Sequence, residues 1–317
     1  MCSNGVLYFE PKVQEYLRKY GKYLSFAISI DGNKELHDKC RVLADGSGSY
    51  DLAMKAVRHY VDELGGTIGC KMTISPDNIT YLYDAVLSLI DNGYVDIMLN
   101  CVYEKGWTAE HATILYQELK RVSDYIIEHD LVDELYLSIL DPKHGTPSDH
   151  DGNWCGGAGM MLAISPDSKY YPCLRYMSSS LGDVREPYAI GDVETGIGKT
   201  DLYRERIECL NCITKASQSP EKCMTCPIAS GCGWCSAYNY EVFGTPNKRA
   251  TFICIMHQAR ILATAYYWNT WYQKINSDKR YGLNIPKDWA LEIIDEEEFE
   301  SLKRGEMING PNNCGEI

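Results

Sequence analysis

Nine cysteines lie within residues 155–254, at spacings that suit metal binding. They are Cys155, Cys173, Cys209, Cys212, Cys223, Cys226, Cys232, Cys235 and Cys254. The stretch "CMTCPIASGCGWC" (223–235) holds two CxxC pairs, and such a pair brings two thiolates to one metal centre. In a reducing compartment, clustered CxxC pairs bind metal more often than they form disulfides. The spacing therefore predicts a metal site.

The kind of metal follows from the donor atoms. No histidine is spaced as a ligand, and thiolates alone suit either zinc in a four-thiolate site or an iron–sulfur cluster. Zinc ribbons usually separate their CxxC pairs by more than the five residues between Cys226 and Cys232. Two four-iron clusters need eight ligands, and the segment offers nine. The spacing favours iron–sulfur clusters, with a structural zinc module as the alternative.

A second set of polar residues follows two apolar runs in the first half of the chain. Ser29, Asp31 and Arg41 lie in "SIDGNKELHDKCR", and Asn100 begins "NCVYEKGW". If the runs are strands, these side chains stand at strand ends, where α/β proteins bind their ligands. In the plainer interpretation Asp-Gly-Asn is a turn and Arg41 a surface charge. The residues alone do not decide between the two.

Apolar runs that read as strands alternate with helical patterns over the first 140 residues. The strand-like runs are 6–9, 24–30, 67–74, 94–100 and 134–140, and the helical patterns are 11–21, 50–66, 78–93 and 108–130. Pro11, and Thr108 with Glu110, are suited to helix starts. Strand–helix alternation predicts an α/β fold with a parallel sheet, either a barrel or a doubly wound sheet.

The character of the sequence changes near residue 141. A Gly-, Pro- and Asp-rich loop is followed by a predicted hairpin that ends at Cys173, and then by the cysteine-rich segment. Residues 255–275 have a helical pattern in which Tyr266, Tyr267, Trp268 and Trp271 read as packing residues. The acidic end of the chain is predicted to be a loose tail.

Composition excludes several classes of function. The net charge of -13 argues against non-specific nucleic-acid binding. No apolar run is long enough to cross a bilayer, and the first residues lack the pattern of a secretory signal. We therefore expect no nucleic-acid partner, no membrane association and a cytoplasmic location.

The cysteine pattern resembles the SPASM domain of radical SAM peptide-modifying enzymes. That family's pattern is C-x(9–15)-G-x4-C, then C-x2-C-x5-C-x3-C, then a final C. Cys155 and Cys173 match its opening, with Ser168 where the glycine usually stands; Cys235 comes one residue early, and Cys254 closes the set. Upstream, "SNGVLY" and "SIDGNKELHDKCR" resemble strand ends of the radical SAM barrel.

The resemblance implies cofactors and their ligands. Ser29, Asp31, Arg41 and, more weakly, Asn100 match residues around S-adenosylmethionine (SAM). The "CSAYNYEVFGTPNKRATFIC" stretch is most similar to maturases that install thioether crosslinks in ribosomally made, cysteine-containing peptides. Those enzymes carry two auxiliary [4Fe–4S] clusters. Carried over, Cys223, Cys226, Cys232 and Cys254 bind one cluster. Cys155, Cys173 and Cys235 bind the other, with Cys209 or Cys212 as a fourth ligand.

One departure from the family is large. The family's catalytic [4Fe–4S] cluster needs CxxxCxxC, and neither that motif nor "GGEP" occurs in the chain. In the complete enzyme, reductive cleavage of SAM gives a 5′-deoxyadenosyl radical that takes a hydrogen from the peptide. We expect the chain alone not to cleave SAM, so whether it is an enzyme by itself is left open. The first two barrel strands are expected to be missing, and a separate chain is one source of them.

The preferred interpretation has three parts. A partial (β/α) radical-SAM barrel spans 1–140, a cysteine-rich α+β SPASM domain spans 141–275, and an acidic C-terminal tail spans 276–317. The expected function is that of the C-terminal portion of a radical SAM peptide maturase. A non-enzymatic iron–sulfur protein that binds peptides or transfers electrons is the alternative.

Overall fold

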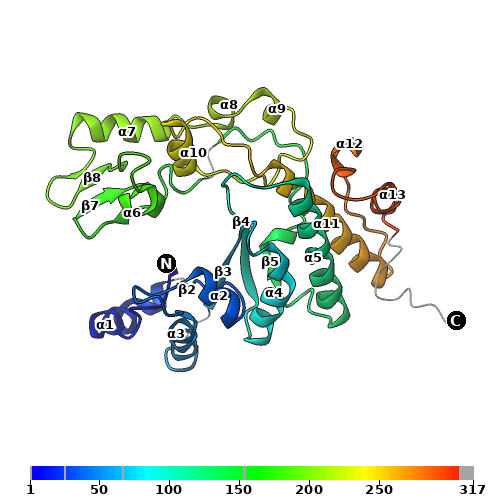
Figure 1. The fold of residues 1–317 in the computed structure, drawn as a ribbon, viewed down its shortest axis with the longest axis horizontal. Coiled ribbons are helices and arrows are strands. Elements are labelled where there is room, and N and C mark those ends of the chain that lie inside the picture. The colour runs from blue at the N-terminus through cyan, green and yellow to red at the C-terminus, as the bar shows by residue number, and fades with distance from the viewer. Residues whose placement is uncertain (1, 25, 66–67, 153–154, 307–317) are drawn as a thin grey trace. The chain divides into compact units, whose positions relative to one another are not determined.

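The chain forms two compact units (Figure 1). The structure is a computed structural model, and it describes residues 2–24, 26–65, 68–152 and 155–306. Unit 1 comprises Met1–Val102, Trp107–Pro142 and Ile255–Ile317, and unit 2 comprises Tyr103–Gly106 and Lys143–Cys254. The compact units change after Pro142 and after Cys254, and the sequence prediction placed domain boundaries at residues 140 and 275. The long helix that begins at Cys254 packs on unit 1.

Unit 1 is built on a parallel sheet with strands in chain order, which confirms the predicted α/β class. Its strands are β1 (Cys2–Ser3), β2 (Phe26–Ile28), β3 (Ile68–Ile74), β4 (Asp96–Cys101) and β5 (Tyr136–Leu137). The helices between them are α1 (Pro11–Tyr20), α2 (Lys34–Cys40), α3 (Tyr50–Asp62), α4 (Leu82–Asp91) and α5 (Ala109–Glu128). Pro11 and Thr108 begin their helices as predicted, and the Thr108 side chain accepts the N–H of His111.

The predicted strand at 6–9 is wrong. This run forms turns in which the N–H of Tyr8 donates to the carbonyl of Gly5 at 3.1 Å. Gly5 has φ +76°, a conformation that favours glycine. The turn buries Tyr8 against Phe26, and its hydroxyl contacts His59 at 3.0 Å. The run of apolar residues therefore buries one aromatic side chain and forms no strand.

Helices cover the apolar face of the sheet. Along β4, buried residues alternate with exposed ones, and Ile97 and Leu99 are buried while Met98 and Asn100 are exposed. Helices α3, α4 and α5 lie along one side of the sheet (Figure 1). Alternate strand side chains point to opposite faces, so the apolar set packs under these helices. The exposed set of β4, which includes Asn100, therefore lies on the other face.

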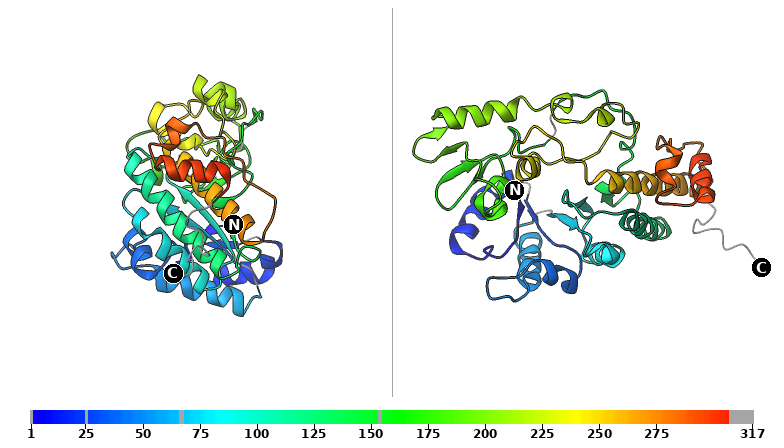
Figure 2. Two further views of the ribbon diagram at one scale, coloured as in Figure 1. Left: turned by 90° about the vertical axis from the view of Figure 1, so that its right-hand side faces the viewer. Right: turned by 45° about the horizontal axis from the view of Figure 1, so that its top comes forward.

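Helix α11 (Cys254–Lys274) and the segment after it pack against α5 (Figure 2). The hydroxyl of Tyr266 donates to Asp124 at 2.6 Å, and Tyr266 and Tyr267 are buried as predicted. The expected loose tail is not loose through residue 306. It contains α12 (Lys287–Ala290) and α13 (Glu296–Arg304), and the segment buries five apolar side chains: Ile285, Ala290, Ile293, Phe299 and Leu302.

Unit 2 has a small antiparallel sheet and short helices. Its strands are β6 (Ala163–Ile164), β7 (Lys169–Tyr171), β8 (Gly191–Asp192) and β9 (Gly196–Ile197), and β6–β7 is the predicted hairpin. Its helices are α6 (Ser178–Leu181), α7 (Asp201–Asn211), α8 (Lys215–Gln218), α9 (Glu221–Met224) and α10 (Ser236–Phe243). Tyr176, Tyr188, Trp234 and Ala237 belong to its core, against which Cys155, Cys173 and Cys235 pack.

Within the part of the chain that the structure describes, no helix combines the length and apolar character needed to cross a membrane.

Candidate cofactor and metal sites

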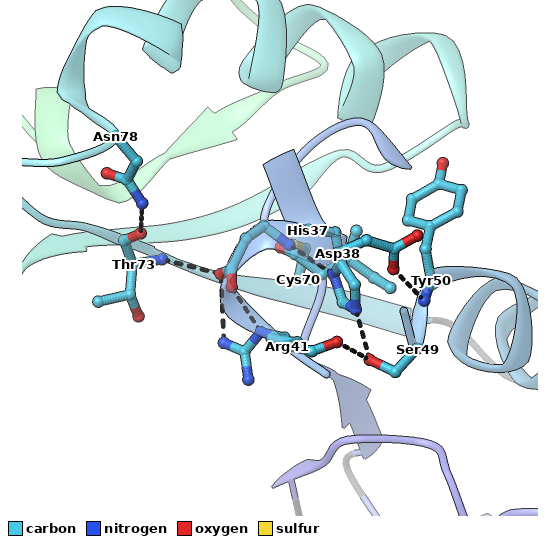
Figure 3. Close-up of polar contacts among 10 residues, drawn as sticks. His37, Asp38, Arg41, Ser49, Tyr50, Cys70, Thr73 and Asn78 are labelled. Atoms are coloured by element: carbon cyan, nitrogen blue, oxygen red, sulfur yellow. Dashed lines mark hydrogen bonds and ion pairs between the residues drawn. The ribbon is translucent and has the colours of Figure 1, made fainter. Parts of the chain in front are cut away.

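Asp31 and Arg41 form a partly buried ion pair beyond the end of β2, and Arg41 is labelled in Figure 3. Nε of Arg41 donates to Oδ2 of Asp31 at 2.5 Å, and its Nη2 donates to Oδ1 at 3.2 Å. The backbone N–H of Thr73, on β3, also donates to Oδ1 at 3.2 Å. Asp31 is only 4% exposed, and a buried carboxylate needs such partners. Arg41 is therefore not a free surface charge.

The Asp31-Gly32-Asn33 segment is more than a turn. Gly32 has φ +97°, and a Cβ there would lie 2.4 Å from the Cβ of Ala85 on α4. Only glycine allows this approach of the loop to the helix. Asn33 then caps α2, because its Oδ1 accepts the N–H of Leu36 at 2.9 Å. These contacts fix Asp31 at the end of the strand.

His37 supports the same loop, although no role was predicted for it. Its Nδ1 accepts the N–H of Asp31 at 3.2 Å, and its Nε2 lies 3.1 Å from Oγ of Ser49. Oγ of Ser49 in turn donates to the carbonyl of Arg41 at 2.8 Å (Figure 3). Burial lowers the pKa of His37, so the ring is neutral near pH 7. A histidine that accepts a backbone N–H leaves no spacing signal in a sequence.

The other two residues matched to the SAM pocket lie at strand ends of the same sheet. Ser29 directly follows β2, and its N–H donates to the carbonyl of Ser3 at 2.9 Å. Asn100 is exposed and pairs in register with Thr73 of β3. The N–H of Thr73 donates to Asp31. Asn100 therefore lies on β4, opposite the residue of β3 that contacts the ion pair. Thr73 was not singled out by the sequence.

Cys155, Cys173 and Cys235, here called the three-thiol group, gather in unit 2. A Cβ built on Gly157 would lie 3.4 Å from Sγ of Cys173 and 3.7 Å from Sγ of Cys155. Cys235 is close enough to interact electrostatically with both of these thiols. Burial raises the pKa of the Cys235 thiol to about 11, so without a metal the thiol is protonated at neutral pH.

Cys223, Cys232 and Cys254 form a second group. The thiol of Cys254 interacts electrostatically with Cys232 and Cys223, and burial raises its pKa to about 11. Nη2 of Arg249 donates to Sγ and to the carbonyl of Cys232, both at 3.1 Å. Cys226 is half-buried in the loop after α9, where its carbonyl accepts the N–H of Ala229 at 3.3 Å.

Cys209 and Cys212 lie on α7 and at its end. Cys209 interacts with the hydroxyl of Tyr188. Cys212 is exposed at the C-cap of the helix. Between them, Asn211 lies close to the loop that follows Cys155, because its Oδ1 is 3.5 Å from the Cβ position of Gly159.

The two thiol groups have the donor type of an iron–sulfur cluster, because thiols are the ligand class that such clusters use. The ligands of a four-iron cluster bind different irons, so they need not converge on one point. Within the described residues, no three or more His, Cys, Asp or Glu side chains converge closely enough to hold one metal ion.

The comparisons with known proteins concern the fold. No protein-family model and no curated protein sequence matches the chain. The solved structures include the anaerobic sulfatase-maturating enzyme anSMEcpe. Its hexahistidine-tagged form with bound AdoMet aligns with a TM-score of 0.56 and 15% identity, over 94% of this chain and 74% of that chain. Its native form with AdoMet and Kp18Cys peptide aligns with a TM-score of 0.55 and 16% identity, over 87% and 75%.

The chain has the radical SAM/SPASM fold. A third structure, native anSMEcpe with AdoMet and Cp18Cys peptide, aligns with a TM-score of 0.55 and 15% identity over 87% of this chain. At these identities the likeness establishes the fold alone. It agrees with the resemblance seen in the cysteine pattern.

Proposed function

We propose that this chain acts as part of a radical SAM/SPASM enzyme that modifies a cysteine-containing peptide, with thioether crosslinking as the expected reaction. SAM binds at the strand ends of unit 1, and two auxiliary [4Fe–4S] clusters bind in unit 2. The observation that carries this proposal is the sorting of distant cysteines into two groups. Cys155 and Cys235 are 80 residues apart in the sequence and share one group, while Cys232, between them, belongs to the other.

Each cluster has a candidate ligand set in this chain. Cys155, Cys173 and Cys235 hold one cluster, and Cys223, Cys226, Cys232 and Cys254 hold the other. Bound there, an iron–sulfur cluster supplies a one-electron acceptor close to the peptide. The chain's own residues partly bury the thiols. Nη2 of Arg249, 3.1 Å from Sγ of Cys232, also offsets negative charge on the sulfur.

Ser29, Asp31, Arg41 and Asn100 bind SAM in this proposal. The carboxylate of Asp31 accepts hydrogen bonds from ribose hydroxyls, and the guanidinium of Arg41 binds the methionyl carboxylate. His37, Thr73 and Gly32 keep Asp31 in place. The peptide partner is supported by the Cys peptides bound to anSMEcpe in its solved structures.

Anaerobic reconstitution with iron and sulfide tests the clusters. We expect about eight irons per chain and a brown protein that dithionite bleaches. A colourless protein with about one or two zincs would instead assign the cysteines to a structural zinc module. The same preparation, incubated with SAM and reductant, should release no 5′-deoxyadenosine, because the chain contains no CxxxCxxC motif.

SAM binding is tested by calorimetry on the reconstituted protein. Asp31→Asn and Arg41→Gln should each weaken binding about 10- to 100-fold, because each removes one charged partner. Asp51→Asn is the matched control, since Asp51 is an exposed carboxylate of unit 1 that pairs with Lys34. Equal affinities in all four proteins would remove the SAM site from this loop.

A further inference from the structure

The hydroxyl of Ser236 lies among the thiols of the three-thiol group. Its Oγ is 3.4 Å from Sγ of Cys155. The Cβ position of Gly157 is 3.4 Å from both Oγ of Ser236 and Sγ of Cys173. Ser236 is 0% exposed and directly follows Cys235, which is the N-cap of α10. One small buried space is therefore lined by two thiol sulfurs and one hydroxyl oxygen.

A second buried hydroxyl in the same place lacks a well-placed partner. Tyr176 is 0% exposed, and its hydroxyl faces the side chain of Ser236 at close range and interacts electrostatically with all three thiols of the group. No hydrogen bond of good geometry satisfies that hydroxyl among the described residues. A buried hydroxyl without a partner is costly, and such a group indicates a missing bound group.

We propose that Ser236 supplies the fourth ligand, an oxygen, to the cluster held by Cys155, Cys173 and Cys235. This inference rests on the proposed function, which requires a cluster there. On binding, the Ser236 hydroxyl gives its proton to water, and the alkoxide oxygen bonds to iron without electron transfer. The Tyr176 hydroxyl then donates a hydrogen bond to the bound oxygen, which satisfies the buried hydroxyl.

This assignment replaces Cys209 and Cys212 as the eighth ligand. Those two residues are on or beside α7, and Ser236 is already at the site. Residue 236 is also where the family pattern Cys-x3-Cys, counted from Cys232, reaches its second position. Cys155, Cys173, Cys235 and Ser236 together make four donors. A ligand from α7 is then not needed.

The test compares four reconstituted proteins: the native chain, Ser236→Ala, Ser236→Cys and the control Ser123→Ala. Ser123 is also 0% exposed, but it lies in unit 1 and donates to the carbonyl of Leu119. Iron per chain, the EPR spectra of oxidised and reduced protein, and the midpoint potential are measured. Circular dichroism of each apoprotein checks folding, so that a misfolded variant is recognised.

Ser236→Ala should lose about one iron per chain and, when oxidised, show the EPR signal of a three-iron cluster. Ser236→Cys should keep the native iron content with a shifted midpoint potential, because thiolate replaces oxygen on one iron. Ser123→Ala should match the native chain. If all four proteins share iron content, spectra and potential, Ser236 is not a ligand. If the native chain takes up no iron, the proposed function itself fails.

Discussion

Ser168 lies in the β6–β7 turn with φ +64°, in the left-handed region that favours glycine. This is the position where the SPASM pattern has glycine, so the backbone explains the family's preference. Ser168→Gly should stabilise unit 2 by roughly 0.5–1 kcal/mol, since it relieves this strain. Melting temperatures of the native chain and Ser168→Gly check this prediction. Ser179→Gly is the control: residue 179 lies in α6 and has no positive φ, so glycine there should lower the melting temperature. A drop for Ser168→Gly as well would contradict the argument.

Gly157 leaves the space that the thiols surround. Its φ is not in the left-handed region, and an alanine Cβ would make contacts of 3.4 Å with Sγ of Cys173 and Oγ of Ser236. Gly157→Ala should therefore fold, with the apoprotein melting within about 1–2 °C of the native chain.

The same methyl group would stand where the proposed function places the cluster of the three-thiol group. Reconstituted Gly157→Ala should hold about four irons fewer than the native chain, as measured by iron quantitation. Gly182→Ala, where a Cβ meets nothing but φ is +55°, is the matched control: it should lose stability but keep its iron. Native iron content in Gly157→Ala would place the cluster elsewhere.

Residue types indicate part of the candidate site from sequence. The cysteines stand out because few other roles use them at those spacings, whereas Asp31 and Arg41 suit a turn and a surface charge as well as a binding site. Ser236, Tyr176 and His37 do not stand out, since hydroxyls and buried histidines serve many structural purposes. Their positions depend on the folding of α2, α10 and the turn Leu174–Tyr176, which brings them to residues distant in the sequence.

At the scale of elements, both α11 and α13 pack against α5. Glu298 of α13 accepts from the hydroxyl of Tyr116 at 2.5 Å and from Nζ of Lys120 at 2.7 Å. Glu298→Ala leaves the buried hydroxyl of Tyr116 and the half-buried ammonium of Lys120 without that acceptor. We expect a loss of about 1–3 kcal/mol in unfolding free energy, measured by urea denaturation, and faster hydrogen exchange in α13. Glu297→Ala, in the same helix, is the control and should change little.

Asp124 on α5 makes stability depend on pH. Burial raises its pKa, while Lys120 and the hydroxyl of Tyr266 oppose this, and Glu128 and Glu298 add to it. A carboxyl pKa raised in the folded state favours folding at low pH, and that contribution is lost as pH rises through the folded pKa. Asn keeps an oxygen that accepts from Tyr266 and carries no charge. Asp124→Asn should therefore stabilise the protein more at pH 7 than at pH 4.

Melting temperatures of the native chain and Asp124→Asn across pH 4–8 check this prediction. A gain that is constant with pH would show that the carboxylate charge is not the cause. Asp130→Asn is the control, because that carboxylate is exposed and pairs with Lys274 at 2.7 Å.

Elements were predictable where caps and periodicity agreed, and α1 and α5 begin at Pro11 and just after Thr108 as expected. The run at 6–9 was misread, because four apolar residues suit a turn that buries one of them as well as a strand. The end of the chain was misread for a different reason. The many acidic residues of this segment suggested a solvated tail. Its apolar residues Ile293, Phe299 and Leu302 are nevertheless buried, and α13 packs against α5.

At the scale of the whole molecule, the two units should respond to different ligands. A ligand that binds only the folded state stabilises it by about 2.7 kcal/mol at one hundred times its dissociation constant. Scanning calorimetry should resolve two transitions. Cluster reconstitution should raise one, belonging to unit 2, and SAM should raise the other, belonging to unit 1. Equal shifts of a single transition by either ligand would show that the units unfold together.

The chain crosses between the units four times, after Val102, Gly106, Pro142 and Cys254. The short segment Tyr103–Gly106 brings Glu104 to Arg175, and the N–H of Lys105 donates to the hydroxyl of Tyr238 at 3.2 Å. Unit 2 is therefore formed by two separate stretches of sequence, and a gene fusion that moves only one continuous stretch cannot transfer all of it. A graft of residues 143–254 would leave Arg175 with Glu241 alone, so any chimera must carry these four residues of a distant loop as well.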